Sequence, residues 1–77
     1  MALIQDAATT WSAPVTLIQD EVWQAREGSV FISTTASPDA NDGLALNMKD
    51  GLRLKVGLTV RYRKIGNTAA LIAREAV

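Results

Sequence analysis

The sequence predicts an all-β protein, specifically a small antiparallel β-sandwich or barrel with an extended N-terminal arm. Three observations favour this class. From Val15 onward, short β-branched or apolar runs are separated by Gly, Pro, Asn and Asp, a pattern typical of strands and turns. One stretch alternates between apolar residues and polar residues or glycine. The chain has only 77 residues, which is enough for one domain with a small core.

Strands are expected wherever an apolar run lies between turn residues. Gly28, Pro38, Gly43, Gly51 and Gly66 mark turns by their backbone preferences. The expected strand ranges are 15–18, 22–26, 29–35, 44–46, 52–56, 58–64 and 69–75. The last range also contains good helix formers, so a short helix is the alternative there. We predict a strand because so short a helix would be marginal by itself.

Residues 52–63 give the clearest pattern, since every even position is apolar and every odd position is polar or glycine. Such alternation predicts a half-buried sheet with one face toward solvent. A three-residue loop at 55–57 would keep apolar residues opposite one another, pairing Leu54 with Leu58. That loop also requires Gly57 in the left-handed conformation. We therefore expect a hairpin here, with one continuous bent strand as the alternative.

Residues 1–14 are expected to form the arm, and residues 15–77 the single β domain. The arm is rich in small and polar residues and contains Trp11. On so small a protein, Trp11 either folds back on its own core or anchors in a neighbouring molecule, as interface tryptophans often do. The first ten residues contain Asp6 and lack Lys and Arg, unlike a secretion signal. We expect a soluble protein made in a host cytoplasm, without membrane contact.

Charge is divided unevenly along the chain although the formal net charge is zero. Residues 1–50 contain seven acidic and two basic residues, for a net charge of −5, whereas residues 51–77 contain six basic and one acidic, for +5. A basic 53–64 hairpin could bind nucleic acid through phosphates. We favour contacts between oppositely charged strands, within the domain or between subunits, because Tyr62 is the only aromatic residue among these basic residues.

The residue inventory argues against catalysis and against a bound cofactor or metal. Without His or Cys, the chain lacks the usual transition-metal ligands and the common nucleophile–base pairs. The segment 39–43 has a glycine one position too early for a calcium loop and no closing glutamate. Asp20 and Glu21 are adjacent, so on a strand they would face opposite ways, and we expect a solvated turn there. Ser33 and its neighbouring threonines are expected to be ordinary strand residues.

The candidate residues for a partner interface are two tryptophans and three arginines. Trp23 is followed by polar residues on a predicted strand, and it is expected to be the packing centre of the core, with a surface anchor as the alternative. The arginines are expected on the solvent or partner face of the predicted hairpin. The full set is Trp11, Trp23, Arg53, Arg61 and Arg63.

Five segments together resemble the small β-sandwich decoration, or cement, proteins that coat the capsids of tailed bacteriophages. They are Val22–Arg26, Gly28–Ser33, Asp42–Leu46, Asp50–Leu54 and Val60–Lys64. The resemblance implies a structural virion protein, typically a homotrimer, which binds the major capsid protein on the capsid exterior and stabilises contacts between its subunits. A head-fibre or tail-associated β module is the alternative. Neither implies an enzyme, a cofactor or a small-molecule substrate, and nucleic acid is not favoured as a partner.

Overall fold

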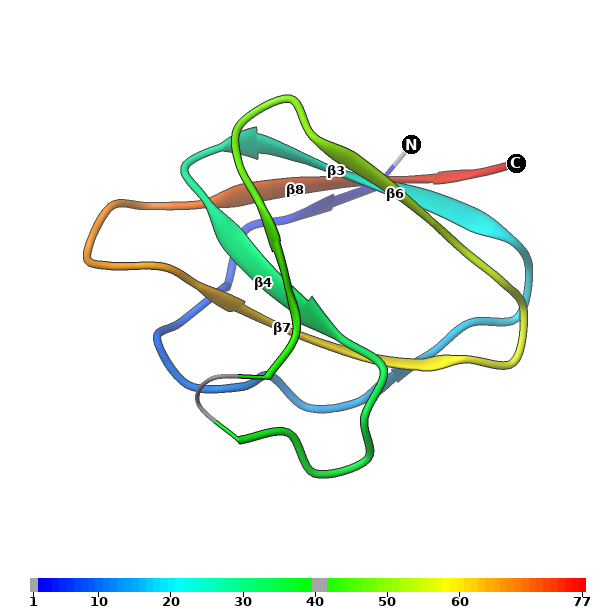
Figure 1. Ribbon diagram of the computed structural model, residues 1–77. Helices are drawn as coiled ribbons and strands as arrows, with labels where there is room; N and C mark the ends of the chain where they lie inside the picture. Colours follow the sequence, from blue (N-terminus) through cyan, green and yellow to red (C-terminus); the bar gives the residue numbers. More distant parts are fainter. Residues whose placement is uncertain (1, 40–41) are drawn as a thin grey trace.

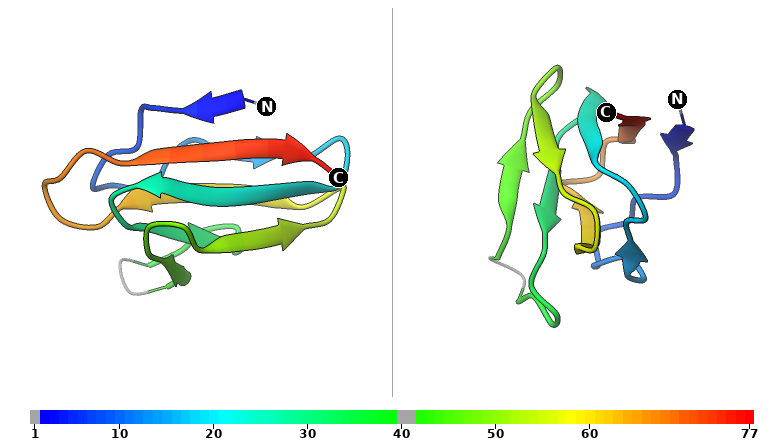
Figure 2. Two further views of the ribbon diagram at one scale, coloured as in Figure 1. Left: turned by 90° about the horizontal axis from the view of Figure 1, so that it is seen from above. Right: turned by 90° about the vertical axis from the view of Figure 1, so that its right-hand side faces the viewer.

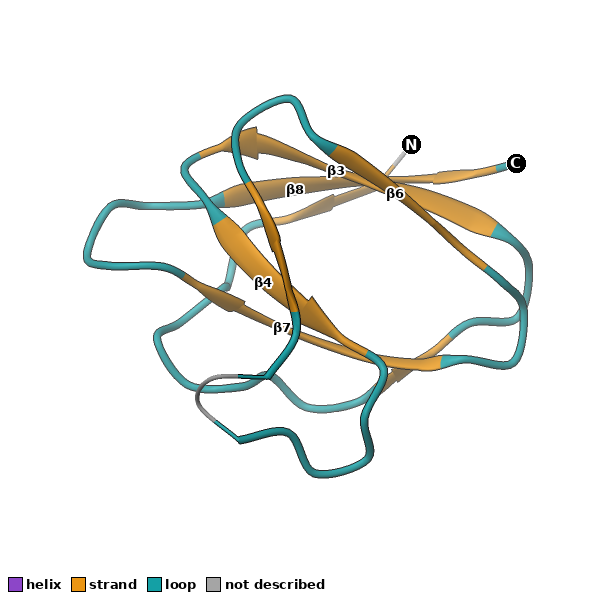
Figure 3. Ribbon diagram, in the orientation of Figure 1, coloured by secondary structure: helices purple, strands orange, loops and turns teal. Residues whose placement is uncertain are grey.

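The protein is an all-β sandwich in a computed structural model that describes residues 2–39 and 42–77, where strands occur and helices do not (Figures 1 and 3). Within these residues, two antiparallel sheets have the orders β1-β8-β3-β6 and β2-β7-β4-β5, named sheet 1 and sheet 2 below. The strands are β1 (Ala2–Ile4), β2 (Val15–Thr16), β3 (Glu21–Glu27), β4 (Val30–Ser33), β5 (Leu44–Leu46), β6 (Gly51–Leu54), β7 (Thr59–Lys64) and β8 (Leu71–Ala76). The prediction of a small antiparallel sandwich is confirmed.

Successive strands mostly change sheet, and this gives the two sheets matching orders. β1 precedes β2, β7 precedes β8, β3 precedes β4 and β5 precedes β6, and in each pair the two strands occupy equivalent places in the two sheets. The strands of one sheet cross those of the other at an angle (Figure 1). The fold thus resembles one sheet of long strands bent over on itself, in which each strand contributes to both layers.

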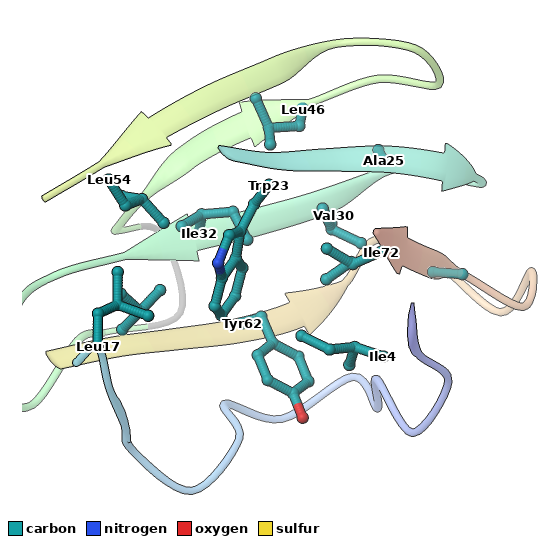
Figure 4. Close-up of a cluster of buried hydrophobic side chains, with 12 residues drawn as sticks. Ile4, Leu17, Trp23, Ala25, Val30, Ile32, Leu46, Leu54, Tyr62 and Ile72 are labelled. Atoms are coloured by element: carbon teal, nitrogen blue, oxygen red, sulfur yellow. The ribbon is translucent and has the colours of Figure 1, made fainter. Parts of the chain in front are cut away.

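The core lies between the two sheets and is centred on Trp23, whose side chain is fully buried. Its ring packs edge to face against Tyr62, with 6.1 Å between the ring centroids (Figure 4). Ile32 of sheet 2 and Ile72 of sheet 1 belong to the same buried cluster. Alternating burial along β3 and β7 follows from the period of two in a strand. The expectation that Trp23 is the packing centre holds.

The predicted arm does not project from the domain. Its first part, β1, extends sheet 1 by pairing with β8, and Ile4 is buried in the core. Its later part runs along β7 of sheet 2, where the Ser12 amide donates to the carbonyl of Tyr62 at 2.9 Å. The segment therefore closes one side of the sandwich. The sequence did not reveal β1, because three apolar residues are too few for a pattern.

The predicted hairpin at residues 52–64 is wrong. β6 pairs with β3 in sheet 1, whereas β7 pairs with β2 and β4 in sheet 2. The connection between them passes from sheet 1 to sheet 2, so the arrangement is closer to the alternative of one continuous bent strand. Gly57 has the expected left-handed conformation, with a φ of 90°. Within β6 and β7, the alternation correctly indicates which side chains face the core. Because strands of both sheets face the same core, the alternation is the same whichever sheet a strand belongs to. Facing direction alone cannot identify a strand's partner.

Two glycines test how tightly the corners of the sandwich are packed. Gly28 and Gly66 have similar positive φ angles of 65° and 75°. A Cβ on Gly28 would lie 2.7 Å from the carbonyl oxygen of Ala69, whereas a Cβ on Gly66 would meet nothing within 4 Å. We predict that Gly66→Ala costs about 1 kcal/mol of unfolding free energy from backbone strain, and Gly28→Ala at least about 1 kcal/mol more from overpacking. Urea denaturation measures the free energy of unfolding of both variants. Equal losses in the two would contradict the close packing of Gly28 against Ala69.

Candidate interaction surfaces

Trp11 folds back over the outer face of sheet 2 and there holds an arginine between two aromatic rings. The guanidinium carbon of Arg63 lies 5.2 Å from the Trp11 ring centroid and 4.3 Å from that of Phe31. The indole N–H of Trp11 donates to the carbonyl of Asp39 at 2.9 Å. Cation–π attraction and this hydrogen bond fix the indole on its own domain. Of the two expectations for Trp11, the structure shows the fold-back, with the side chain half-buried.

The three candidate arginines do not share one surface. Arg61 and Arg63 lie on the outer face of sheet 2, where a guanidinium N–H of Arg61 donates to the carbonyl of Ser12 at 3.1 Å. Arg53 is exposed on β6 of sheet 1. Since the two sheets face opposite ways, the basic hairpin that a nucleic acid would need is not formed. The geometry gives no support to that alternative.

The buried carboxylate of Glu21 accepts hydrogen bonds from Trp23 and Arg74. The indole N–H of Trp23 donates to it at 2.9 Å, and Arg74 donates through Nε at 2.9 Å and Nη2 at 3.0 Å. The Arg74 guanidinium also lies 5.0 Å from the Trp23 ring centroid. Glu21 is only 4% exposed, so the solvated turn expected there is wrong at this residue. Trp23 is enclosed and cannot be a surface anchor in this fold.

The pKa of the Glu21 carboxyl is lowered from its usual value of 4.5. Hydrogen bonding from Arg74 is the main cause; burial opposes it, and the Trp23 N–H adds to the lowering. A lowered folded-state pKa means that Glu21 contributes stability above about pH 4.5, and that this contribution is lost as the pH falls through the folded-state value. The ion pair therefore stabilises the fold at neutral pH.

We predict that Glu21→Gln lowers the free energy of unfolding at neutral pH by about 2 kcal/mol or more, because Arg74 and the indole lose a charged acceptor. The loss should shrink as the pH falls below 4.5 and through the lowered pKa of Glu21, because the wild-type carboxylate then becomes protonated too. Urea denaturation across pH checks this. Glu75→Gln, which removes an exposed carboxylate on β8 next to Arg74, is the matched control and should change stability by less than about 0.5 kcal/mol. Equal effects of the two variants would refute a structural ion pair.

Tyr62 connects the core to the N-terminal segment. Its hydroxyl donates to a carboxylate oxygen of Asp6 at 2.7 Å, and its ring packs on Trp23. Burial, followed by the hydrogen bond to Asp6 and the charge of Asp6, raises the pKa of Tyr62 to about 12. A raised folded-state pKa means that stability present below pH 10 is lost as the pH rises from 10 toward 12.

Tyr62 is the only tyrosine, so its ionisation can be followed by tyrosinate absorbance. We predict that it ionises near pH 12 while the protein stays folded. Asp6→Asn should lower this pKa without returning it to 10, since burial remains the larger cause. Circular dichroism at each pH shows whether the fold persists. Ionisation near pH 10 in the folded wild type would mean that the N-terminal segment does not cover Tyr62.

The loops 17–20 and 55–58 and the C-terminal residue are joined by hydrogen bonds at one end of the sandwich (right-hand end of Figure 1), and each of these segments carries exposed apolar residues. We call this group, which consists of Ile18, Val56, Leu58 and Val77, the apolar tip. Ile18 is 87% exposed and Val56 56% exposed. Such a concentration of large apolar side chains at one end is typical of an interaction surface.

Hydrogen bonds hold the loops of the apolar tip in place. The Leu17 amide donates to Leu58 and its carbonyl accepts from Gly57, both at 2.9 Å. Asp20 accepts from the Val56 amide through its carboxylate at 2.8 Å and from the Val77 amide through its carbonyl at 3.0 Å. These bonds place the apolar side chains before any partner binds, so little ordering would be needed on binding.

Sequence reasoning missed the apolar tip and the Glu21–Arg74 pair. Ile18 and Val56 were assigned to strand ends, and only the loop-to-loop hydrogen bonds bring them together. Arg74 lies 53 positions from Glu21, and local patterns do not report such pairs. Among residues 2–39 and 42–77, no group of three or more acidic residues could hold a metal ion, and no helix could cross a membrane. Ala40 and Asn41 of the rejected calcium loop lie outside the described residues.

Comparison with protein-family models, curated proteins and solved structures gives no match to this chain.

Proposed function

We propose that this protein is a non-enzymatic structural component of a virion, a decoration protein that binds the outside of a phage capsid and stabilises contacts between major capsid protein subunits. The apolar tip is the observation that carries the proposal. Its four large side chains come from two loops and the C-terminal residue, and hydrogen bonds hold these segments together. An apolar surface fixed in advance suits docking into a complementary apolar pocket on a larger protein.

The chemistry of the domain supports a structural role. Its prominent ionisable groups are engaged in holding the fold: Glu21 accepts from Arg74 and Trp23, and Asp6 accepts from Tyr62. Arg63 is stacked between Trp11 and Phe31. These ionisable side chains are thus engaged in holding the fold, whereas the large apolar side chains of the tip, which a partner would bury, are exposed.

The resemblance of the strand and turn segments to capsid decoration proteins supplies the identity of the proposed partner. In this arrangement the tip would dock on the major capsid protein, and the two sheet faces would remain toward solvent or toward neighbouring copies. A head-fibre or tail-associated module could dock in the same way. The two differ in the number of copies that each virion carries.

We predict that Ile18→Ser and Val56→Ser each weaken binding to capsids assembled without this protein by about tenfold, because each removes a large apolar side chain from the contact. Met48→Ser is the matched control, since Met48 is 57% exposed but lies on the connection between β5 and β6, away from the tip. Co-sedimentation with capsids measures binding, and circular dichroism confirms folding. Unchanged binding of both tip variants would overturn docking through the tip.

A further inference from the structure

We propose that β5 is a self-association surface, at which a second copy of this chain pairs its own β5 in antiparallel orientation and extends sheet 2 across a two-fold axis. This inference is independent of the proposed function and of the apolar tip. It rests on three features of the β5 side of the sandwich: an edge strand without protection, an opening into the core beside it, and a strand sequence that matches itself.

The first feature is that β5 lacks the devices that keep edge strands from pairing with other chains. An exposed edge presents backbone N–H and C=O groups to any extended strand, and natural edges are usually guarded by charge, proline or a bulge. At the other edge of sheet 2, β2 has two residues and follows Pro14. At the neighbouring edge of sheet 1, β6 carries Arg53. β5 consists of Leu44, Ala45 and Leu46; it is short, as β2 is, but it carries no charge or proline and pairs with β4 without a bulge.

The second feature is an opening into the core on the β5 side. An open cleft of about 410 Å³ lies between the edges of the two sheets, and its lining combines Ile32, Leu44, Leu52 and Leu54 with Ser33, Thr34, Thr35 and Gly43. Leu44 is 60% exposed at its mouth. The opposite side of the sandwich also ends in an uncharged strand, β1, but there Ile4 is buried between the sheets. β5 is the outermost strand of sheet 2 on this side (Figure 2, right), so the exposed leucine and the apolar part of the cleft lie beside an open edge.

The third feature is the self-complementary sequence of β5. In an antiparallel pair centred on Ala45, Leu44 of each copy lies opposite Leu46 of the other, and the small Ala45 residues meet at the axis. One such contact covers both openings, whereas pairing of β5 with β1 of a neighbour would cover only one. The formal net charge of zero means that no overall charge repulsion opposes association. A two-fold dimer is therefore the favoured arrangement, in place of the trimer that the resemblance implies.

A three-residue strand gives a small contact, below the roughly 1,200 Å² of standard stable complexes, so the dimer should be weak, with a dissociation constant on the order of 100 µM. Sedimentation equilibrium up to about 1 mM protein should detect it. Leu44→Lys should raise the dissociation constant at least about tenfold by placing charge on the edge. Val56→Lys, at a residue of similar exposure in the apolar tip, should leave it unchanged.

Amide exchange then tests the contact at residue level. With rising protein concentration, amides of β5 that point to the open edge should become protected in the wild type and remain unprotected in Leu44→Lys. Circular dichroism checks that both variants are folded. A protein that stays monomeric at 1 mM, a trimer that Leu44→Lys leaves intact, or an association lost in Val56→Lys instead would overturn the inference. None of these results bears on whether the apolar tip binds capsids.

Discussion

A buried indole N–H must find an acceptor inside the core, and this requirement organises one end of the sandwich. Trp23 is fully buried, and its N–H donates to Glu21 two residues earlier on β3. A carboxylate in that position needs a cation, which Arg74 supplies from the neighbouring strand β8. The bidentate contact aligns β8 beside β3, and the Arg74 guanidinium then lies over the Trp23 ring. Burial of Trp23 thus accounts for its hydrogen bond to Glu21, for the Glu21–Arg74 ion pair and for a side-chain contact between β3 and β8.

The chain must also enclose its core without disulfides, and it does so by passing repeatedly from one sheet to the other. Most successive strands lie in opposite sheets, so most connections join the two layers directly. The N-terminal segment closes one side by adding β1 to sheet 1 and leading into β2 of sheet 2. Asp6 binds Tyr62 and Trp11 covers Arg63, so this segment belongs to the domain. Among the apolar residues that the fold leaves exposed are those of the apolar tip and Leu44 on the β5 side. Both proposals about partners concern those two places.

The sequence identified the features that depend on local pattern. The all-β class, the final strand and the central place of Trp23 follow from alternation and residue type, and the structure confirms them, with the strand predicted at 69–75 found at Leu71–Ala76. Features that depend on long-range pairing could not be predicted. Both β6 and β7 carry the same alternation, yet they belong to opposite sheets because each has a better partner elsewhere. Glu21 was misjudged because its burial depends on Arg74, far away in sequence. The apolar tip arises from two loops, and loops carry no periodic signal.

The copy number of this chain in purified virions tests the proposed function most directly. Quantitative mass spectrometry would measure the ratio of this protein to the major capsid protein, using particles washed to remove loosely bound material. A protein that coats the shell should be present in a ratio near the stoichiometry of the capsid subunits, and we predict that result. A few copies per particle would indicate a fibre or tail component, and absence from the particles would contradict a structural role in the virion.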